Sequence, residues 1–145
     1  MHQTVIHYID DDPEDIEFFQ YAIDTIHQQI ILHTHTKEAS LFAALRNEKH
    51  ANQILFLDIN MPGKNGIEIL KEIRKSEALQ KTPVIMYSTT KDASIIELCQ
   101  QFGANLYAIK PVSFSSIGDI INKIIAINWH EFKPESNTFV ISASV

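Results

Sequence analysis

Short apolar runs alternate with amphipathic stretches along most of this chain, with a repeat of about 25 residues that is typical of strand–helix units. The apolar runs predict five buried strands, at residues 5–9, 30–35, 53–57, 83–87 and 104–109. Apolar residues at helical spacing predict a helix after each strand, beginning near residues 12, 37, 67, 94 and 113. We therefore expect an α/β fold in which helices cover both faces of a five-stranded parallel sheet.

The alternation stops near residue 128, so we expect one domain over residues 1–128 and a C-terminal tail over residues 129–145. Pro134 and the polar residues after it are typical of a linker. Phe139-Val140-Ile141 is apolar and β-prone, which indicates a short strand or a docking peptide. We expect this segment to pack on its own domain or on a second protomer, which leaves a homodimer open. A frayed end is the alternative.

Composition narrows the function classes. The 145 residues carry a net charge of -6 and show no stripe of Lys and Arg, which argues against DNA binding. The lone Cys99 excludes an intramolecular disulfide. No apolar run approaches the roughly 20 residues needed to span a bilayer, and the first residues do not resemble a signal peptide. We expect a soluble, cytoplasmic protein that does not bind membranes.

Polar residues with complementary chemistry stand where the predicted strands end. Asp10 and Asp11 follow the first strand, Asp58 the third, Ser88 the fourth and Lys110 the fifth. Each alone is more often a turn or capping residue. The carboxyl ends of parallel strands, however, meet at one edge of the sheet, where ligands bind. Clustered carboxylates need a cation beside them, and the set of acids, hydroxyl and ammonium predicts a phosphoryl-transfer site that holds Mg²⁺.

The motifs around these residues resemble the receiver domains of bacterial two-component response regulators, over about residues 4–127. They are Ile9-Asp10-Asp11, Leu57-Asp58-Ile59-Asn60-Met61-Pro62, Asn65-Gly66, Pro83-Val84-Ile85-Met86-Tyr87-Ser88, Gly103-Ala104 and Tyr107-Ala108-Ile109-Lys110-Pro111. The resemblance implies a flavodoxin-like, doubly wound sheet with the strand order 2-1-3-4-5. We expect no effector domain after the fifth helix, so the resemblance is to the stand-alone, single-domain type.

The resemblance also assigns a phosphoacceptor and a metal site. Asp58 corresponds to the aspartate that takes a phosphoryl group from a sensor histidine kinase or a histidine phosphotransfer protein. Asp11 corresponds to the direct Mg²⁺ ligand, joined by Asp58 and by the backbone carbonyl of Asn60, and Asp10 corresponds to a ligand acting through water. Mg²⁺ favours such a mixture of few carboxylates and retained waters.

Three further residues match positions that act on the phosphoryl group in this family. Lys110 is expected to pair with Asp58 and then with its phosphoryl group, and the hydroxyl of Ser88 to bond a phosphoryl oxygen. Tyr107 matches the aromatic switch position, whose ring turns inward when the hydroxyl residue moves toward the phosphate. Such a domain catalyses its own phosphorylation and dephosphorylation without being a conventional enzyme, and signals to a downstream protein through phosphorylation-dependent contacts.

Two alternatives stay open from the sequence. A degenerate receiver would act only as a scaffold, but the intact set of acids, Ser88 and Lys110 argues against it. A Mg²⁺-dependent phosphatase with an aspartyl nucleophile would need a second acid where this chain has Asn60, which cannot donate a carboxyl proton. Separately, His33 and His35 share one face of a predicted edge strand and could bind metal, although solvated histidines are the simpler interpretation. His7 is expected to be a buried histidine with a hydrogen-bond partner.

Overall fold

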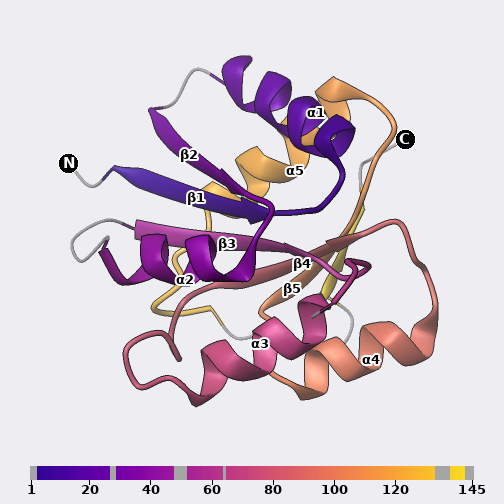
Figure 1. The fold of residues 1–145 in the computed structure, drawn as a ribbon. Helices are drawn as coiled ribbons and strands as arrows, with labels where there is room; N and C mark the ends of the chain where they lie inside the picture. Colours follow the sequence, from indigo (N-terminus) through magenta and orange to yellow (C-terminus); the bar gives the residue numbers. More distant parts are fainter. Residues whose placement is uncertain (1–2, 27–28, 48–51, 64, 133–137, 143–145) are drawn as a thin grey trace.

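A single parallel sheet runs through the centre of the computed structural model, which describes residues 3–26, 29–47, 52–63, 65–132 and 138–142 (Figure 1). Its strands follow the order β2-β1-β3-β4-β5-β6, and every neighbouring pair is parallel. The strands are β1 (Thr4–Ile9), β2 (Ile30–His35), β3 (Asn52–Asp58), β4 (Val84–Ser88), β5 (Leu106–Ile109) and β6 (Val140–Ile141). The predicted order of the first five strands is confirmed.

Helices cover both faces of the sheet, as predicted (Figure 1). On one face lie α1 (Pro13–Asp24) and α5 (Phe114–Ile125), and on the other lie α2 (Glu38–Asn47), α3 (Gly66–Lys75) and α4 (Ala93–Gln101). Strand β3 shows why this arrangement buries so much apolar surface. Ile54 and Phe56 pack under α1 and α5, whereas Leu55 and Leu57 pack under the other helices, because successive side chains of a strand point to opposite faces.

The helix α1 begins where the sequence predicts it, near residue 12. Asp12 caps the helix, and its side chain accepts a hydrogen bond of 2.9 Å from the Glu14 N–H. Pro13 occupies the first turn, where its missing N–H costs nothing. This cap directly follows Asp10 and Asp11, so the local chemistry that begins the helix also fixes the loop that carries two of the predicted site residues.

Strand β5 is shorter than predicted, beginning at Leu106 and not at residue 104. The side chain of Asn105 explains the difference. Its Oδ1 atom accepts hydrogen bonds of 2.8 Å from the Val84 N–H and from the Arg74 guanidinium, which holds this residue in a turn before the strand. The end that matters for the site is unaffected, since β5 still finishes at Ile109, immediately before Lys110.

The five predicted strands are present, and the tail adds a sixth, β6, where the sequence indicated a short strand or a docking peptide. β6 pairs in parallel with β5, and the Phe139 side chain beside it is only 1% exposed. Of the three possibilities for the apolar tail segment, packing on its own domain is thus confirmed for residues 138–142. Which surface of the domain this segment contacts was not predicted, because a sheet edge and a helix face were both open to it. Pro134, in the expected linker, lies outside the described residues.

The histidines on β1 and β2 lie under α2. His7 is fully buried and its Nε2 atom lies 2.7 Å from the Gln53 side-chain oxygen, which confirms the prediction for this residue. His35 is also buried and is hydrogen bonded at Nδ1 to the Ser40 hydroxyl at 2.9 Å, so its assignment as a solvated residue is wrong. The helix that follows β2 closes over it.

A separate finding concerns membranes. Within the part of the chain that the structure describes, no helix has both the length and the apolar character that a membrane crossing requires.

Candidate functional site

Two strand ends bring the carboxylates of Asp10, Asp11 and Asp58 together. The register of β1 and β3 pairs Ile9 with Leu57, so the residue that follows each of them lies at the same edge of the sheet. One carboxylate oxygen from each of the three acids lies within 4.8 Å of the others. Asp10 and Asp58 are buried, whereas Asp11 is exposed. The predicted acidic pocket is therefore present, closed on one side and open to solvent at Asp11.

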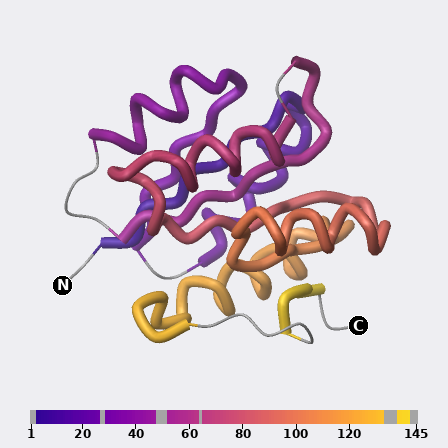
Figure 2. The backbone as a smooth tube through the Cα atoms, turned by 90° about the horizontal axis from the view of Figure 1, so that it is seen from below, coloured from indigo at the N-terminus to yellow at the C-terminus, as the bar shows by residue number. Residues whose placement is uncertain are grey.

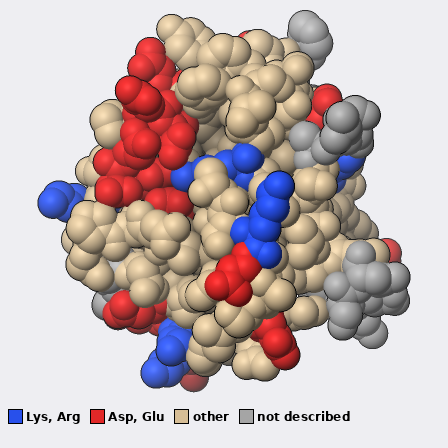
Figure 3. Space-filling model, turned by 90° about the vertical axis from the view of Figure 1, so that its right-hand side faces the viewer, with Lys and Arg blue, Asp and Glu red and all other residues tan. Residues whose placement is uncertain are grey.

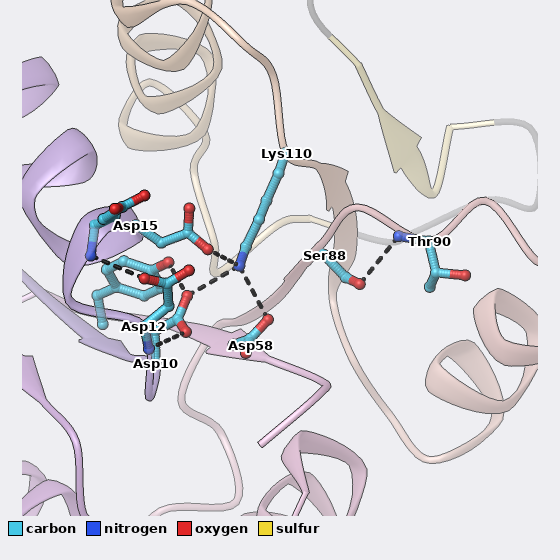
Figure 4. Close-up of polar contacts among 9 residues, drawn as sticks. Asp10, Asp12, Asp15, Asp58, Ser88, Thr90 and Lys110 are labelled. Carbon is cyan, nitrogen blue, oxygen red and sulfur yellow. Dashed lines mark hydrogen bonds and ion pairs between the residues drawn. The ribbon is translucent and has the colours of Figure 1, made fainter. Parts of the chain in front are cut away.

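Lys110 projects its ammonium group into this pocket from the end of β5 (Figure 4). Its Nζ atom donates hydrogen bonds to Asp58 at 3.1 Å, to Asp10 at 2.9 Å and to Asp15 at 2.9 Å. Burial alone would lower the pKa of Lys110, but the three carboxylates raise it above its ordinary value. The lysine therefore stays charged, and it bonds Asp10 and Asp15 as well as Asp58, whereas pairing with Asp58 alone was predicted.

Asp10 is held as a carboxylate by donors that the sequence did not reveal. The Tyr8 hydroxyl and the Asp12 N–H both donate to it, the latter at 3.0 Å. Burial on its own would raise the pKa of Asp10, but these hydrogen bonds and Lys110 outweigh it and lower the pKa below its ordinary value. Tyr8 lies on β1 and Asp10 follows that strand two residues later, and in extended backbone this spacing puts both side chains on one face, which was the available signal.

The pKa of Asp58 is displaced in the opposite direction. Burial raises it to about 7, helped by the negative charge of Asp10 and opposed by Lys110. At neutral pH this group is thus poised between its two protonation states. A bound cation would favour the carboxylate, because an opposite charge within a few ångströms stabilises the ionised form.

The acid cluster fits a hard divalent cation. All its ligand atoms are carboxylate oxygens, which Mg²⁺ prefers, and the exposure of Asp11 leaves room for the waters that Mg²⁺ retains. Acidic side chains also gather at the surface, with basic side chains at the border of their patch (Figure 3), and Asp12 and Glu14 are among the exposed acids. Beside the pocket lies a cavity of about 370 Å³, lined by Asp11, Lys37 and Met61 among others.

Ser88 and Tyr107 are connected through the loop that follows β4. Ser88 is buried at the end of that strand, and its hydroxyl oxygen accepts a hydrogen bond of 3.2 Å from the Thr90 N–H (Figure 4). The Tyr107 hydroxyl donates to the Thr90 carbonyl at 2.9 Å. The ring of Tyr107 is completely buried, so it occupies the inward position. Burial raises the pKa of the Tyr107 hydroxyl, which keeps it a hydrogen-bond donor.

Asn60 and Asp15 lie on segments that adjoin the site. Asn60 is exposed in the loop that leads from β3 to α3, two residues beyond Asp58. Asp15, on the first turn of α1, bonds Lys110 and was not predicted as a site residue. The short distance in sequence from Asp10 to the first turn of this helix was the signal that could have placed Asp15 at the site.

Comparison with known proteins gives a consistent result. A family model described as the response regulator receiver domain matches residues 6–122. Chemotaxis protein CheY-3 of Vibrio cholerae is 41% identical over 68 residues, which cover 46% of this chain and 52% of that protein. Sensory/regulatory protein RpfC of Xanthomonas campestris is 28% identical over 92 residues, 62% of this chain and 12% of that protein. The chain thus spans about half the length of these curated relatives, or less.

Solved structures extend the similarity to most of the fold. The crystal structure of a response regulator receiver domain from Rhodospirillum rubrum superposes with a TM-score of 0.67 at 27% identity, covering 83% of this chain and 89% of that one. The phosphorylated cyanobacterial phytochrome response regulator RcpA superposes with a TM-score of 0.74 at 25% identity, covering 92% of this chain and 98% of the other.

Proposed function

This chain belongs to the response regulator receiver domain family, and we propose that Asp58 accepts a phosphoryl group from a phosphohistidine in a Mg²⁺-dependent reaction. Receiver domains take their phosphoryl group from histidine kinases or phosphotransfer proteins. The observation that carries the proposal is the convergence of Asp10, Asp11, Asp58 and Lys110 at one sheet edge. The solved structure of RcpA is that of a phosphorylated response regulator, which supports the same modification here.

The metal-binding residues follow from the acid cluster. Asp11 would bind Mg²⁺ directly, together with Asp58 and the backbone carbonyl of Asn60, and Asp10 would act through a water molecule. When bound, Mg²⁺ polarises the phosphoryl oxygens and offsets the charge that gathers on them. Asp10 has the role of an outer ligand because its own oxygens already accept hydrogen bonds from Tyr8, Asp12 and Lys110.

Asp58, Lys110 and Ser88 have different roles in the phosphoryl transfer. An oxygen of the Asp58 carboxylate forms the new bond to phosphorus, and the bond between phosphorus and the donor histidine nitrogen breaks. Lys110, 3.1 Å from Asp58 before the reaction, neutralises charge on the transferred group. The Ser88 oxygen already accepts the Thr90 N–H, so its own proton can be donated to a phosphoryl oxygen.

A carboxylate acceptor suits a reversible signal, because the mixed anhydride it forms retains enough free energy to be hydrolysed and to drive a change of shape. We place Asn60 and Thr90 beside the path of the hydrolytic water, so their identities would tune the lifetime of the phosphorylated state. The output would be a protein contact that depends on phosphorylation. The intact set of site residues favours this function over a scaffold, and Asn60 disfavours a phosphatase.

Intact-mass measurement after incubation with acetyl phosphate tests the proposal. The wild-type chain is expected to gain one phosphoryl group with Mg²⁺ present and none in EDTA. Asp58→Asn should abolish the gain, because it removes the nucleophile. Glu17→Gln, which changes an exposed acid on α1, is the matched control and should behave as wild type. A phosphoadduct that persists in Asp58→Asn would show that another residue is the acceptor.

A further inference from the structure

The tail strand is attached to the sheet at the residue that also contacts the site loop. Figure 2 shows β6, in yellow, beside the orange helix α5 at one side of the molecule. The Tyr107 N–H donates a hydrogen bond of 2.9 Å to the Phe139 carbonyl, and Tyr107 is paired with Val140 in the strand register. The backbone of Tyr107 therefore holds the tail.

The side chains of Phe139 and Tyr107 lie in the same part of the core. Phe139 is 1% exposed and Tyr107 is fully buried, and both belong to the core cluster on the face covered by α2, α3 and α4. Cys99 of α4 and Ala104 belong to the same cluster. Closely packed interiors leave little room for a ring to move while its neighbours stay in place. Docking of Phe139 and packing of Tyr107 therefore belong to the same close-packed core.

From Tyr107 the contacts continue to the site. Its hydroxyl donates to the Thr90 carbonyl at 2.9 Å, and the Thr90 N–H donates to the Ser88 hydroxyl oxygen at 3.2 Å. Ser88 is anchored beside Lys110, whose N–H donates to the Ser88 carbonyl at 2.9 Å. Three successive hydrogen bonds thus lead from the Phe139 carbonyl to the hydroxyl of Ser88.

We propose that docking of β6 on β5 is coupled to occupancy of the phosphoryl site, with Phe139 as a positioning residue that acts through Tyr107. This inference rests on the proposed role of Asp58. The docked tail holds Tyr107 inward and thereby places Thr90 and Ser88 for the phosphoryl group. Without the Phe139 side chain, the tail loses its buried apolar anchor and β6 holds Tyr107 less firmly, so the phosphoryl group has to order the loop itself, which weakens its binding. By linkage, the phosphoryl group must tighten the tail by the same factor.

The test measures the affinity of the full chain for beryllofluoride, a phosphoryl mimic, by NMR titration at fixed Mg²⁺. Phe139→Ala is expected to bind beryllofluoride at least about fivefold more weakly than wild type, because fivefold is the lower end of typical coupling between sites. Phe139→Leu retains the apolar bulk and should restore most of the affinity. Val140→Ala is the matched control, because Val140 neighbours Phe139 but is 39% exposed, and its affinity should equal that of wild type.

A second measurement needs no variant. Hydrogen exchange at the Tyr107 amide, which is bonded to the Phe139 carbonyl, reports opening of the tail. Beryllofluoride should slow this exchange in the wild-type chain by a factor comparable to the affinity loss in Phe139→Ala. Equal affinities in all variants, or an exchange rate at the Tyr107 amide that beryllofluoride does not change, would overturn the coupling but leave the proposed function intact. Failure of the wild-type chain to bind the mimic would overturn the proposed function as well.

Discussion

The ammonium group of Lys110 and the carboxylate of Asp58 lie 3.1 Å apart, although 52 residues separate them in the chain. Both side chains are nearly buried, and each follows or ends a strand of the same parallel sheet. Without Lys110, the buried Asp58 carboxylate would be left as an uncompensated charge, whereas Lys110 without Asp58 still has Asp10 and Asp15 as partners. The pair therefore links the fold to the chemistry of the site.

Replacing Lys110 tests that link. Lys110→Gln is expected to slow phosphorylation of Asp58 by acetyl phosphate on the order of 100-fold, since it removes the group that offsets charge on the transferred phosphoryl. The rate is followed by intact mass at saturating Mg²⁺. Lys123→Gln, which changes an exposed lysine near the end of α5, is the control and should leave the rate unchanged. A rate within about twofold of wild type in Lys110→Gln would remove the lysine from the mechanism.

The stability of the metal-free chain should depend on pH through Asp58. Its pKa is about 7 in the folded chain because it is buried, above its ordinary 3.8. Between these values the folded chain holds a proton that the unfolded chain has released, so the Asp58 contribution to stability falls as pH rises through this window. Asp58→Asn removes the penalty and should stabilise the chain by on the order of 2 kcal/mol at pH 8, and by much less at pH 4. Urea unfolding in EDTA at both pH values measures the difference, and an equal effect at both would contradict it.

His35 should produce a pH dependence of the opposite sign. Burial, together with the nearby His7 and His33, lowers its pKa to about 4 in the folded chain, from an ordinary 6.5. The unfolded chain takes up a proton between these values and the folded chain does not, so the His35 contribution is lost as pH falls from about 6.5 to about 4. His35→Gln should therefore flatten the fall in stability between pH 7 and pH 5. His130→Gln, at an exposed position, is the control and should lose stability as steeply as wild type. An equally steep fall in His35→Gln would contradict the assignment.

The sequence predicted the site residues better than their partners. Asp10, Asp58 and Lys110 were found because an apolar run marks where a strand ends, and parallel strands end at one edge. Tyr8 and Asp15 were missed because their contacts depend on how a core side chain and a helix turn toward that edge, which periodicity does not specify. The burial of His35 depends on the placement of α2 over β2. The pairing of β6 depends on the edge of β5 being free to accept another strand. Both are properties of the assembled sheet.

Metal binding should distinguish the acids of the pocket. Asp11→Ala is expected to weaken Mg²⁺ binding at least about tenfold, because it removes an exposed carboxylate that lies within ligand distance of Asp10 and Asp58. Asp15→Asn is the matched control, since Asp15 bonds Lys110 but lies outside the three-acid cluster, and its Mg²⁺ affinity should change little. Calorimetric titration with Mg²⁺ measures both. Equal losses in the two variants would mean that net charge, and not coordination, governs binding.

The approach of α3 to the end of β3 should be sensitive to a single methyl group at Gly66. A Cβ atom there would lie 2.2 Å from the Asp58 carbonyl oxygen, which is backbone and cannot rotate away. Gly66→Ala should therefore destabilise the chain by about 2–4 kcal/mol and slow phosphorylation, because relief of the clash displaces the backbone of Asp58. Gly118→Ala is the matched control. Its Cβ would meet nothing nearer than the Thr25 hydroxyl at 3.9 Å, and in the middle of α5 alanine should stabilise by about 0.5–1 kcal/mol. Urea unfolding of both variants, with intact-mass rates for Gly66→Ala, measures the contrast. Similar stabilities for the two variants would show that the start of α3 tolerates displacement from Asp58.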